Sequence, residues 1–487
     1  MRIFILCLFT LSTFLAKSQA YKISVQYVYQ PDSYLYLGYY FGDKKYLLDS
    51  AKLDENGKAI ITGEKVLTGG LYIIVDPQKS RYFDVVIDKE PFFDVTIDTA
   101  FVLQSVKGSL ENNQLETYKQ ATTTIFKNFS EWQSQLKDAK TKKDSAVAQE
   151  KISNAVSRAE QWRDSFVVKN PDSYVSLLFR LMGEPSYDLK AAKTKEDTIV
   201  AFQEYKRNYW KDIPIGDPRV LRTPMFEGRV MKYMEQIVPR DPDSMKAEID
   251  KFILYGRSDT TMFKYYVSRF TNEYMNPKYM GLDVIFLHLF EKYYQTSQVT
   301  WLEDKDKELI YNRAYNLMGN IVGKPAAELN LLDTFARPKS LYAVKAPYTL
   351  LVFWDPDCGH CREQVPLIDS LYNAEWNKTG MKLIGVLVDT IRKDNSSWPA
   401  VRKKWIQFIA DKNIKGWDHW YETLDMRNEN IRNNIPNFRQ NYDVYQTPTI
   451  YLLDANKKII AKKISPEQIH DFLEFQKNKS AEQKKTN

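Results

Sequence analysis

Residues 348–361 have the sequence YTLLVFWDPDCGHC, in which seven mostly apolar residues precede a short polar break and a Cys-x-x-Cys motif. An apolar run of this length and composition predicts a buried strand. The residues from Cys361 to about Asn377 predict a helix, with Val365, Ile368, Leu371 and Tyr372 facing inward. A Cys-x-x-Cys pair between a strand and the start of a helix is typical of a redox-active dithiol. Cys358 and Cys361 are therefore the predicted catalytic residues, and together they form the predicted redox-active disulfide.

The chain beyond this motif continues the alternation of strand and helix. Further strands are predicted over 382–389, 447–454 and 459–464, and Ser465-Pro466 has the composition of a helix cap and first turn. We therefore predict one α/β domain over residues 323–476. The stretch from Thr390 to Tyr445 includes an amphipathic pattern around Trp405, Phe408 and Ile409. We interpret it as mainly structural, with substrate recognition as the alternative.

The upstream chain shows two different patterns. Short apolar or alternating segments separated by turn residues predict an all-β sandwich over residues 21–108. Helical spacing of apolar residues predicts an all-α domain over 109–322, with breaks at 170–173, 213–218 and 239–244. Two aromatic stripes are interpreted as core packing, although they could line a ligand groove; they comprise Phe126, Phe129, Trp132 and Leu136, and Phe263, Tyr266, Val267 and Phe270. His288 lies in an apolar helix and is interpreted as a core residue.

The ends of the chain have compositions of their own. Residues 1–20 combine Arg2, an apolar run and Ser18-Gln19-Ala20, which predicts a cleavable signal peptide and export to the periplasm. Cys7 lies inside the apolar run, where a lipid-attachment cysteine is not expected. No later segment is long and apolar enough to be a transmembrane segment in the mature chain. The basic residues 477–487 predict a disordered tail.

The net charge of the chain and its number of cysteines limit the kinds of function that are compatible with the sequence. The 487 residues include 69 Lys and Arg against 62 Asp and Glu, a net charge of +7 that is dispersed along the chain and does not predict a nucleic-acid partner. Disulfides persist in exported proteins. A structural disulfide gains most by closing a long loop, and the spacing of Cys358 and Cys361 closes almost none. The pair is therefore interpreted as catalytic.

Two motifs carry a resemblance to a known family. The sequences FWDPDCGHCREQVP (353–366) and YQTPT (445–449) resemble those of TlpA/ResA-like exported thiol–disulfide oxidoreductases of the thioredoxin superfamily. The two upstream regions resemble the β-sandwich and helical domains of unknown function that often precede such thioredoxin folds. The resemblance implies a C-terminal thioredoxin fold, client proteins with disulfides, a membrane thiol-reductant donor and no cofactor. It also implies a cis peptide bond at Pro448 that holds the Thr447 backbone towards the dithiol.

The chain departs from the family pattern at three positions. An aspartate, Asp357, precedes the first cysteine where an aromatic residue is usual. Val352 replaces the buried carboxylate of ordinary thioredoxins, and Gln364 stands where TlpA/ResA-like proteins commonly have Glu. These differences leave open the proton-transfer partner and the redox potential.

The residues of the motif have predicted roles. The helix N-terminus favours Cys358 as the exposed nucleophile, and Cys361, one turn deeper, is the resolving thiol. His360, next to Gly359, can stabilise the thiolate when protonated, whereas Asp355 and Asp357 disfavour a second negative charge. Trp354 either shields the site or belongs to the core.

No metal site is predicted. A zinc site on the cysteine pair lacks evident third and fourth ligands, and His419 lacks a second ligand at suitable spacing. Attachment of c-type haem is excluded because Arg362 follows Cys361.

Two functions are compatible with these sequence features. The first is an oxidoreductase that reduces, or isomerises, protein disulfides, with reduction favoured by the family resemblance. The second is a non-catalytic envelope adaptor that uses the thioredoxin fold as a scaffold, because more than half of the mature chain shows no visible chemistry.

Overall fold

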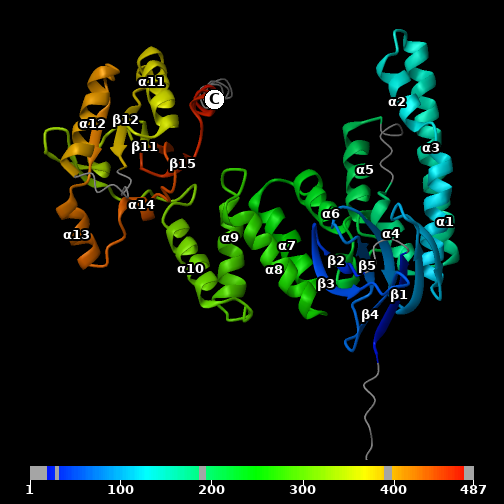
Figure 1. Ribbon diagram of the computed structural model, residues 1–487. Coiled ribbons are helices and arrows are strands. Elements are labelled where there is room, and N and C mark those ends of the chain that lie inside the picture. The colour runs from blue at the N-terminus through cyan, green and yellow to red at the C-terminus, as the bar shows by residue number, and fades with distance from the viewer. Residues whose placement is uncertain (1–18, 28–31, 186–192, 389–397, 476–487) are drawn as a thin grey trace, which may run out of the picture. The chain divides into compact units, whose positions relative to one another are not determined.

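The computed structural model describes residues 19–27, 32–185, 193–388 and 398–475. The chain divides into two compact units, one formed by Met1–Pro239 with Asp250–Phe263 and the other by Arg240–Ile249 with Lys264–Asn487. The predicted fold class is confirmed, because two β-sheets, a helical region and a mixed α/β sheet follow one another along the chain (Figure 1). No helix in the described part of the chain combines the length and hydropathy needed to cross a bilayer.

The first unit begins with a β-sandwich. One sheet has the order β4-β1-β7-β8 and the other the order β3-β2-β5-β6. Both sheets pack their inner faces around one core that includes Ile23, Leu37 and Ile74. Strand β7 alternates between exposed and buried positions, as expected when one face of a sheet is covered. The strands are β1 (Tyr21–Tyr27), β2 (Tyr34–Phe41), β3 (Lys44–Lys52), β4 (Lys58–Gly63), β5 (Gly70–Val75), β6 (Tyr82–Ile87), β7 (Phe92–Ile97) and β8 (Leu103–Lys107).

Three of these strands were not predicted from the sequence. β3, β4 and β8 lie at the edges of the two sheets, where fewer side chains are buried. β3 buries none of its residues completely, so it lacks the apolar run that predicts a strand.

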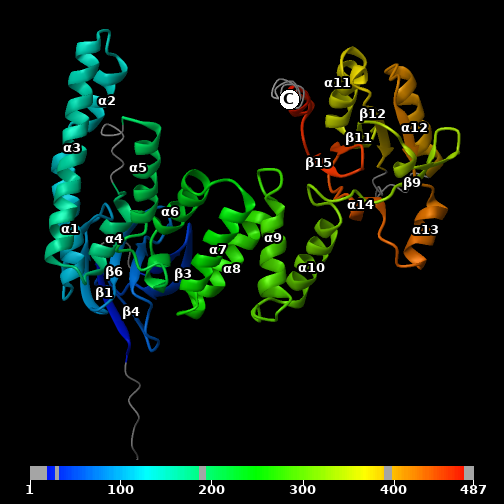
Figure 2. The same ribbon diagram turned by 180° about the vertical axis from the view of Figure 1, so that it is seen from behind.

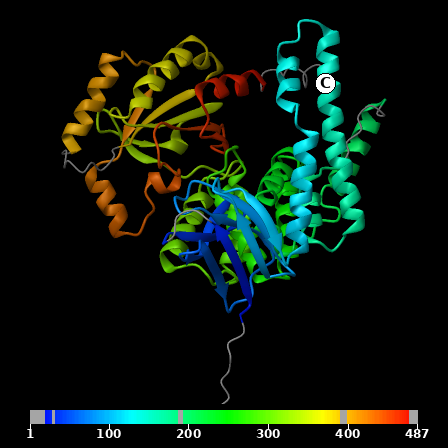
Figure 3. The ribbon, with the colours of Figure 1, turned by 45° about the vertical axis from the view of Figure 1, so that its right-hand side comes forward.

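Helices form the rest of the first unit. Figure 3 shows the cyan helices α2 and α3 running side by side. The predicted stripe from Phe126 to Leu136 spans a break, because Phe126 caps α1 and Phe129 starts α2. Phe126 and Trp132 pack on a small cluster of Ile125, Ala155 and Ala159. The elements are α1 (Leu110–Ile125), α2 (Phe129–Lys137), α3 (Lys142–Lys169), α4 (Tyr174–Met182), α5 (Lys195–Asn208), η1 (Pro218–Arg222), α6 (Phe226–Lys232) and η2 (Tyr233–Ile237).

The second unit contains the remaining helices of the central region, and α7 and α8 have residues in both units. The predicted stripe on α8 is confirmed, since Tyr266, Val267 and Phe270 are fully buried. His288 is half-buried in α9 and not in the centre of the core. These elements are α7 (Pro242–Gly256), α8 (Thr260–Met275), α9 (Asp283–Leu289), η3 (Phe290–Tyr294) and α10 (Asp304–Met318).

The C-terminal part of this unit is a seven-stranded mixed sheet of order β10-β9-β13-β12-β11-β14-β15. The strands are β9 (Asn330–Asp333), β10 (Pro338–Ser340), β11 (Tyr348–Trp354), β12 (Lys382–Leu387), β13 (Asp418–Tyr421), β14 (Thr449–Asp454) and β15 (Ile459–Lys462). β11 pairs in parallel with β12 and antiparallel with β14. Its central position explains its continuous apolar sequence, because both faces of the strand are buried.

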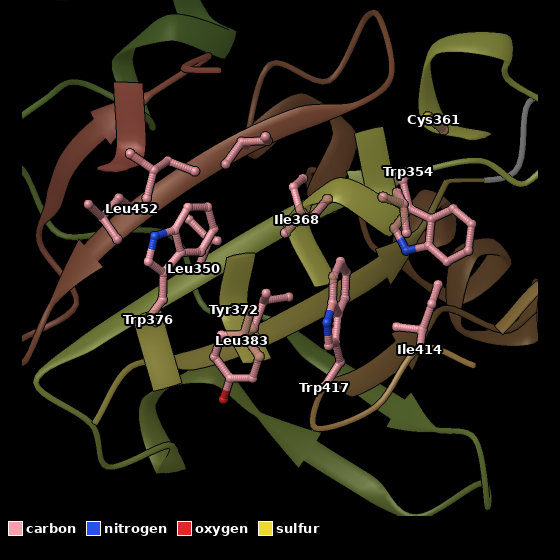
Figure 4. Close-up of a cluster of buried hydrophobic side chains, with 14 of the residues drawn as sticks. Leu350, Trp354, Cys361, Ile368, Tyr372, Trp376, Leu383, Ile414, Trp417 and Leu452 are labelled. Carbon is pink, nitrogen blue, oxygen red and sulfur yellow. The ribbon is translucent and has the colours of Figure 1, made fainter. Parts of the chain in front are cut away.

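Each face of the sheet has its own core. Leu350, Val352 and Trp354 share one core with Cys361 and Val365 of α11 (Gly359–Ala374), and Figure 4 shows part of it. The other face packs against residues that include Phe438 and Tyr442, from α14 (Phe438–Asn441) and its end. Alternation along β11 thus places Trp354 beneath the dithiol helix and Phe353 on the opposite face.

The stretch after β12 adds to the sheet. Figure 2 shows α12 (Trp398–Asp411) and α13 (Leu424–Arg432) in this region, and β13 between them in sequence pairs with β12 and β9. Trp405 is fully buried while Phe408 and Ile409 are half-buried, as the amphipathic pattern predicted. Residues 389–397 lie outside the described residues.

The final helix has the predicted start. Residues 466–475 are helical, and the Ser465 side chain accepts a hydrogen bond from the Gln468 backbone N–H at 3.3 Å. The Ser465 backbone N–H donates in turn to the Gln468 side chain at 2.8 Å, which completes a capping box. The predicted signal peptide, except for its last two residues, and the basic tail lie outside the described residues.

Candidate active site

The dithiol lies where β11 turns into α11. Cys358 is the N-cap residue of α11, so its sulfur lies at the helix N-terminus. Its backbone N–H donates to the Asp355 carbonyl at 3.1 Å, and the Asp357 N–H donates to the Asp355 carboxylate at 2.8 Å. Asp355 therefore shapes the turn that presents Cys358.

Cys358 is the accessible member of the pair. It is partly exposed, and its Sγ donates to the carbonyl oxygen of Thr447 at 3.2 Å. Burial alone would raise its pKa, but hydrogen bonds with the Thr447 side chain, with Cys361 and with the His360 backbone N–H lower the pKa below its ordinary value. These groups favour a thiolate at Cys358.

Cys361 has the opposite environment. It is fully buried, and burial together with the neighbouring Cys358 sulfur raises its pKa to about 12. Hydrogen bonds with Asp355 and Thr447 oppose this rise without cancelling it. Cys358 and Cys361 are both free in this structure, which therefore represents the reduced pair. The environment of Cys358 favours the thiolate, and that of Cys361 favours the neutral thiol.

The segment before β14 completes the site. The peptide bond between Thr447 and Pro448 is cis, in agreement with the family resemblance. Both residues are half-buried, and the Thr447 carbonyl faces Cys358. Cys358 and Thr447, which are 89 positions apart in sequence, are thus brought together where β11 ends and β14 begins.

The other predicted supporting residues have different positions. His360 is exposed, and the group that lowers the Cys358 pKa is its backbone N–H. Gly359 has open space where a Cβ atom would lie, so its surroundings do not require glycine. Trp354 is fully buried, with its ring centroid 5.2 Å from that of Phe408, so it belongs to the core beneath the site.

The three departures from the family pattern are structurally distinct. Val352 is fully buried in the core that contains Cys361. Gln364 is half-buried, whereas its neighbour Glu363 is exposed. Asp357 forms ion pairs with Arg362 at 3.8 Å and with Lys404 of α12 at 3.4 Å.

The ion pairs of Asp357 border a cavity that the sequence did not predict. Its volume is about 570 Å³, and its lining combines the residues around the dithiol with one side of α12; it is lined by Pro356, Asp357, Arg362, Ala400, Lys403, Lys404, Gln407, Phe408 and Asp411. The α12 residues lie well beyond the motif in sequence, with Lys404 47 positions after Asp357, so local spacing carries no signal for this neighbourhood.

The buried histidine of β13 is not part of a metal cluster. His419 is 9% exposed, and burial lowers its pKa to about 4. Its ring stacks on Trp417 and meets Trp405 edge-on. Within the described residues, no group of three or more His, Cys, Asp or Glu side chains is arranged to hold a metal ion.

Comparisons with known proteins agree with this architecture. Residues 322–462 match the AhpC/TSA family, and residues 21–115 match a domain of unknown function, DUF4369. No protein with a curated description matches the chain.

Solved structures with similarity to the chain include proteins from Bacteroides and Cytophaga species. A thioredoxin-like protein from Bacteroides caccae is 17% identical, covers 60% of this chain and 98% of its own, and has a TM-score of 0.46. A domain of a possible thiol–disulfide isomerase from Cytophaga hutchinsonii is 35% identical over 34% of this chain and 97% of its own, with a TM-score of 0.27. The thioredoxin domain of a thiol–disulfide oxidoreductase from Bacteroides vulgatus is 24% identical over 31% and 95%, with a TM-score of 0.25. From the two family matches, the chain carries a C-terminal thioredoxin-like domain of the AhpC/TSA family and an N-terminal DUF4369 domain.

Proposed function

We propose that the protein is an exported thiol–disulfide oxidoreductase that reduces protein disulfides through Cys358 and Cys361. The observation that carries this proposal is the asymmetry of the pair. Cys358 is partly exposed with a lowered pKa, whereas Cys361 is fully buried with a pKa of about 12. The thiolate is the nucleophile in disulfide exchange, so this arrangement suits Cys358 for attack and Cys361 for the second step.

The reaction has two exchanges. The Cys358 thiolate attacks one sulfur of a client disulfide, the client S–S bond breaks, and the other client sulfur leaves as a thiolate that takes up a proton. Cys361 then loses its proton and attacks Cys358, which releases the second client thiolate for protonation. The client gains two electrons and two protons, and the enzyme is left with a Cys358–Cys361 disulfide that a thiol reductant must reduce.

The first exchange prepares the second. The charge and hydrogen bonding of Cys358 contribute to the high pKa of Cys361. Once Cys358 is bonded to the client, its sulfur is uncharged, and this contribution ends. Because burial is the largest cause and remains, the pKa of Cys361 falls only part of the way.

The surroundings of Cys358 offer room for a client. The Thr447 backbone lies on one side, where an extended segment can form main-chain hydrogen bonds. The cavity lined in part by Pro356, Asp357 and Arg362 lies beside the same turn. We propose that client proteins bind across these features, that export follows from residues 1–20, and that a membrane thiol reductant in the periplasm supplies the electrons.

Insulin reduction with dithiothreitol tests the activity. Wild-type protein is expected to accelerate the reaction, and Cys358→Ser is expected to remove the acceleration, while equal rates would reject the proposal. Cys361→Ser is expected to accumulate mixed disulfides with clients, because the second exchange is blocked. Recovery of non-covalent partners alone would favour the adaptor function.

The redox potential separates reduction from isomerisation. Thioredoxin has a potential of about −270 mV and protein disulfide isomerase one of about −180 mV. Equilibration of the Cys358–Cys361 pair with glutathione or dithiothreitol buffers measures this value. A potential near the thioredoxin value supports a reductase, and one near the isomerase value supports an isomerase.

A further inference from the structure

We propose that Arg313 of helix α10 is a positioning residue for the dithiol, because it anchors the segment that carries the Thr447 carbonyl. This inference rests on the proposed function and assigns part of the active-site support to the helical region. The segment, Asn441 to Thr447, is called the proline segment below because it leads into the cis bond at Pro448.

The first observation is a buried charge cluster around Asp443. The carboxylate of Asp443 is fully buried, and Arg313 donates from Nη1 to one of its oxygens. Lys463 donates to the other oxygen at 2.5 Å. A buried carboxylate held by two cations has little freedom to move, so it fixes the middle of the proline segment.

Arg313 is itself held in place. Its Nε and Nη2 both donate to the carbonyl of Met275 at 3.1 Å, and Nη2 also donates to the Asn276 side chain at 3.1 Å. Its side chain is 9% exposed. The guanidinium therefore joins the end of α8 to the proline segment through a rigid fork of donors.

The second observation is that two neighbours of Arg313 contact the same segment. Asn316, one turn along α10, donates to the Tyr445 hydroxyl at 2.5 Å. Asn320, just beyond the helix, donates to the Asn441 carbonyl at 3.2 Å. Positions i, i+3 and i+7 lie on one face of a helix, so one face of α10 and its end holds three residues of the proline segment.

The anchored residues connect directly to the site. Asp443 is four positions before Thr447, and its carbonyl accepts from the Tyr445 N–H at 3.2 Å. The Gln446 carbonyl accepts from the Thr449 hydroxyl at 2.5 Å, which holds the other end. The Thr447 carbonyl then accepts a hydrogen bond from the Cys358 thiol, and the Thr447 side chain helps to lower the pKa of that thiol. Displacement of Asp443 is thus expected to change the reactivity of Cys358.

The test compares two variants that each remove the arginine partner of a fully buried carboxylate. Arg313→Ala breaks the pair that holds the proline segment. Arg81→Ala is the matched control, because Arg81 pairs with the fully buried carboxylate of Asp76 at 3.3 Å and belongs to the β-sandwich of the other unit. The rate of iodoacetamide alkylation of Cys358 is measured from pH 5 to pH 10, in a Cys7→Ser background, together with insulin reduction.

Arg313→Ala is expected to shift the alkylation midpoint of Cys358 upwards by at least half a pH unit and to lower kcat/KM about tenfold. Arg81→Ala is expected to lower thermal stability but leave the alkylation midpoint in place. Arg313→Lys keeps a cation near Asp443 but loses the forked contacts to Met275 and Asn276, so it is expected to restore the midpoint only in part. Should Arg313→Ala fail to fold, Asn316→Ala, which removes one contact from the same helix face, is expected to give a smaller shift in the same direction.

An unchanged midpoint in every folded Arg313 and Asn316 variant would overturn the inference, as would an equal shift in Arg81→Ala. Alkylation needs no client, so this result is independent of whether the wild type reduces insulin. Loss of insulin reduction in the wild type, with the alkylation shifts present, would reject the proposed function while leaving the anchoring role of Arg313 intact.

Discussion

The Sγ atom of Cys358 lies 3.2 Å from the carbonyl oxygen of Thr447, and this contact joins the helix that carries the dithiol to the segment that carries the cis bond. A thiol donates through this contact, whereas a thiolate relies on the donors around it, which are the backbone N–H groups of His360 and Cys361 and the side chains of Thr447 and Cys361. Thr447 therefore interacts with Cys358 in both protonation states: its carbonyl accepts from the thiol, and its side chain stabilises the thiolate.

The two cysteines should alkylate at very different pH. The pKa of Cys358 is below the ordinary thiol value, and that of Cys361 is raised to about 12 by burial. A Cys7→Ser protein treated with iodoacetamide at pH 7.5 is therefore expected to gain one adduct per native chain, at Cys358, and two after denaturation. Mass spectrometry of digested protein locates the adduct. Equal labelling of both residues in the native protein would contradict the predicted asymmetry.

Loss of the Thr447 hydroxyl should destabilise the Cys358 thiolate and so raise the pKa of Cys358. A hydrogen bond to a charged group contributes about 1.5–3 kcal/mol, and 1.36 kcal/mol corresponds to one pKa unit. Thr447→Val is thus expected to raise the Cys358 pKa by about one unit, measured from the pH dependence of thiolate absorbance at 240 nm in a Cys361→Ser, Cys7→Ser background. Thr379→Val, which removes a hydroxyl bonded to the Trp376 carbonyl, is the control and should leave this pKa unchanged. A fall in the Cys358 pKa of Thr447→Val would show that the hydroxyl favours the thiol.

Local sequence patterns were enough to predict the elements that carry the dithiol. β11 has a continuous apolar sequence because both of its faces are covered, and the inward positions Val365 and Ile368 of α11 recur at helical spacing. The positions of Cys358 and Cys361 follow from these two elements. The asymmetry of exposure follows in turn, since the second cysteine lies one turn further into the helix.

The contacts that define the rest of the site could not be predicted in this way. Arg313 and Asp443 are 130 positions apart, and Lys404 and Asp357 are 47 apart, so no local period relates them. The short strands β9, β10 and β13 also lacked a signal, because three or four residues are too few to show an alternation. These features depend on the tertiary fold, which brings side chains together after the local elements have formed.

Two glycines near the dithiol should respond differently to the same substitution. A Cβ atom on Gly385 of β12 would lie 3.0 Å from both the His419 ring nitrogen Nδ1 and the Trp354 Nε1, and 3.2 Å from Trp417. Gly385→Ala must displace large buried rings, and overpacking of a core costs about 1–3 kcal/mol. Gly359→Ala meets open space and is expected to change the unfolding free energy by less than about 0.5 kcal/mol, as for other unstrained surface sites.

Urea unfolding of both glycine variants measures this difference. Gly385→Ala should have a lower free energy of unfolding and an unchanged dithiol, because its contacts are in the core beneath the site. Equal stabilities of the two variants would mean that the aromatic cluster around β12 rearranges without cost.

The buried histidine of β13 should make stability depend on pH. The folded-state pKa of His419 is about 4 because burial disfavours the charged ring, whereas an unfolded chain has the ordinary value of 6.5. Below pH 6.5 the unfolded state therefore binds a proton that the folded state does not. The contribution of the neutral His419 ring to the free energy of unfolding is complete above pH 6.5, falls as the pH decreases, and is lost below about pH 4. This difference between the folded and unfolded pKa values corresponds to about 3 kcal/mol of unfolding free energy.

Replacement of the ring isolates this effect. His419→Phe keeps an aromatic side chain between Trp405 and Trp417 but cannot be protonated, so its unfolding free energy should decrease less between pH 6.5 and pH 4 than that of the wild type, by about 3 kcal/mol. His470→Phe removes a half-exposed histidine beside Glu375 and serves as the control. Urea unfolding at a series of pH values gives the comparison. Parallel plots of unfolding free energy against pH for wild type and His419→Phe would contradict the prediction. They would mean that the folded protein binds a proton at His419 as readily as the unfolded chain does.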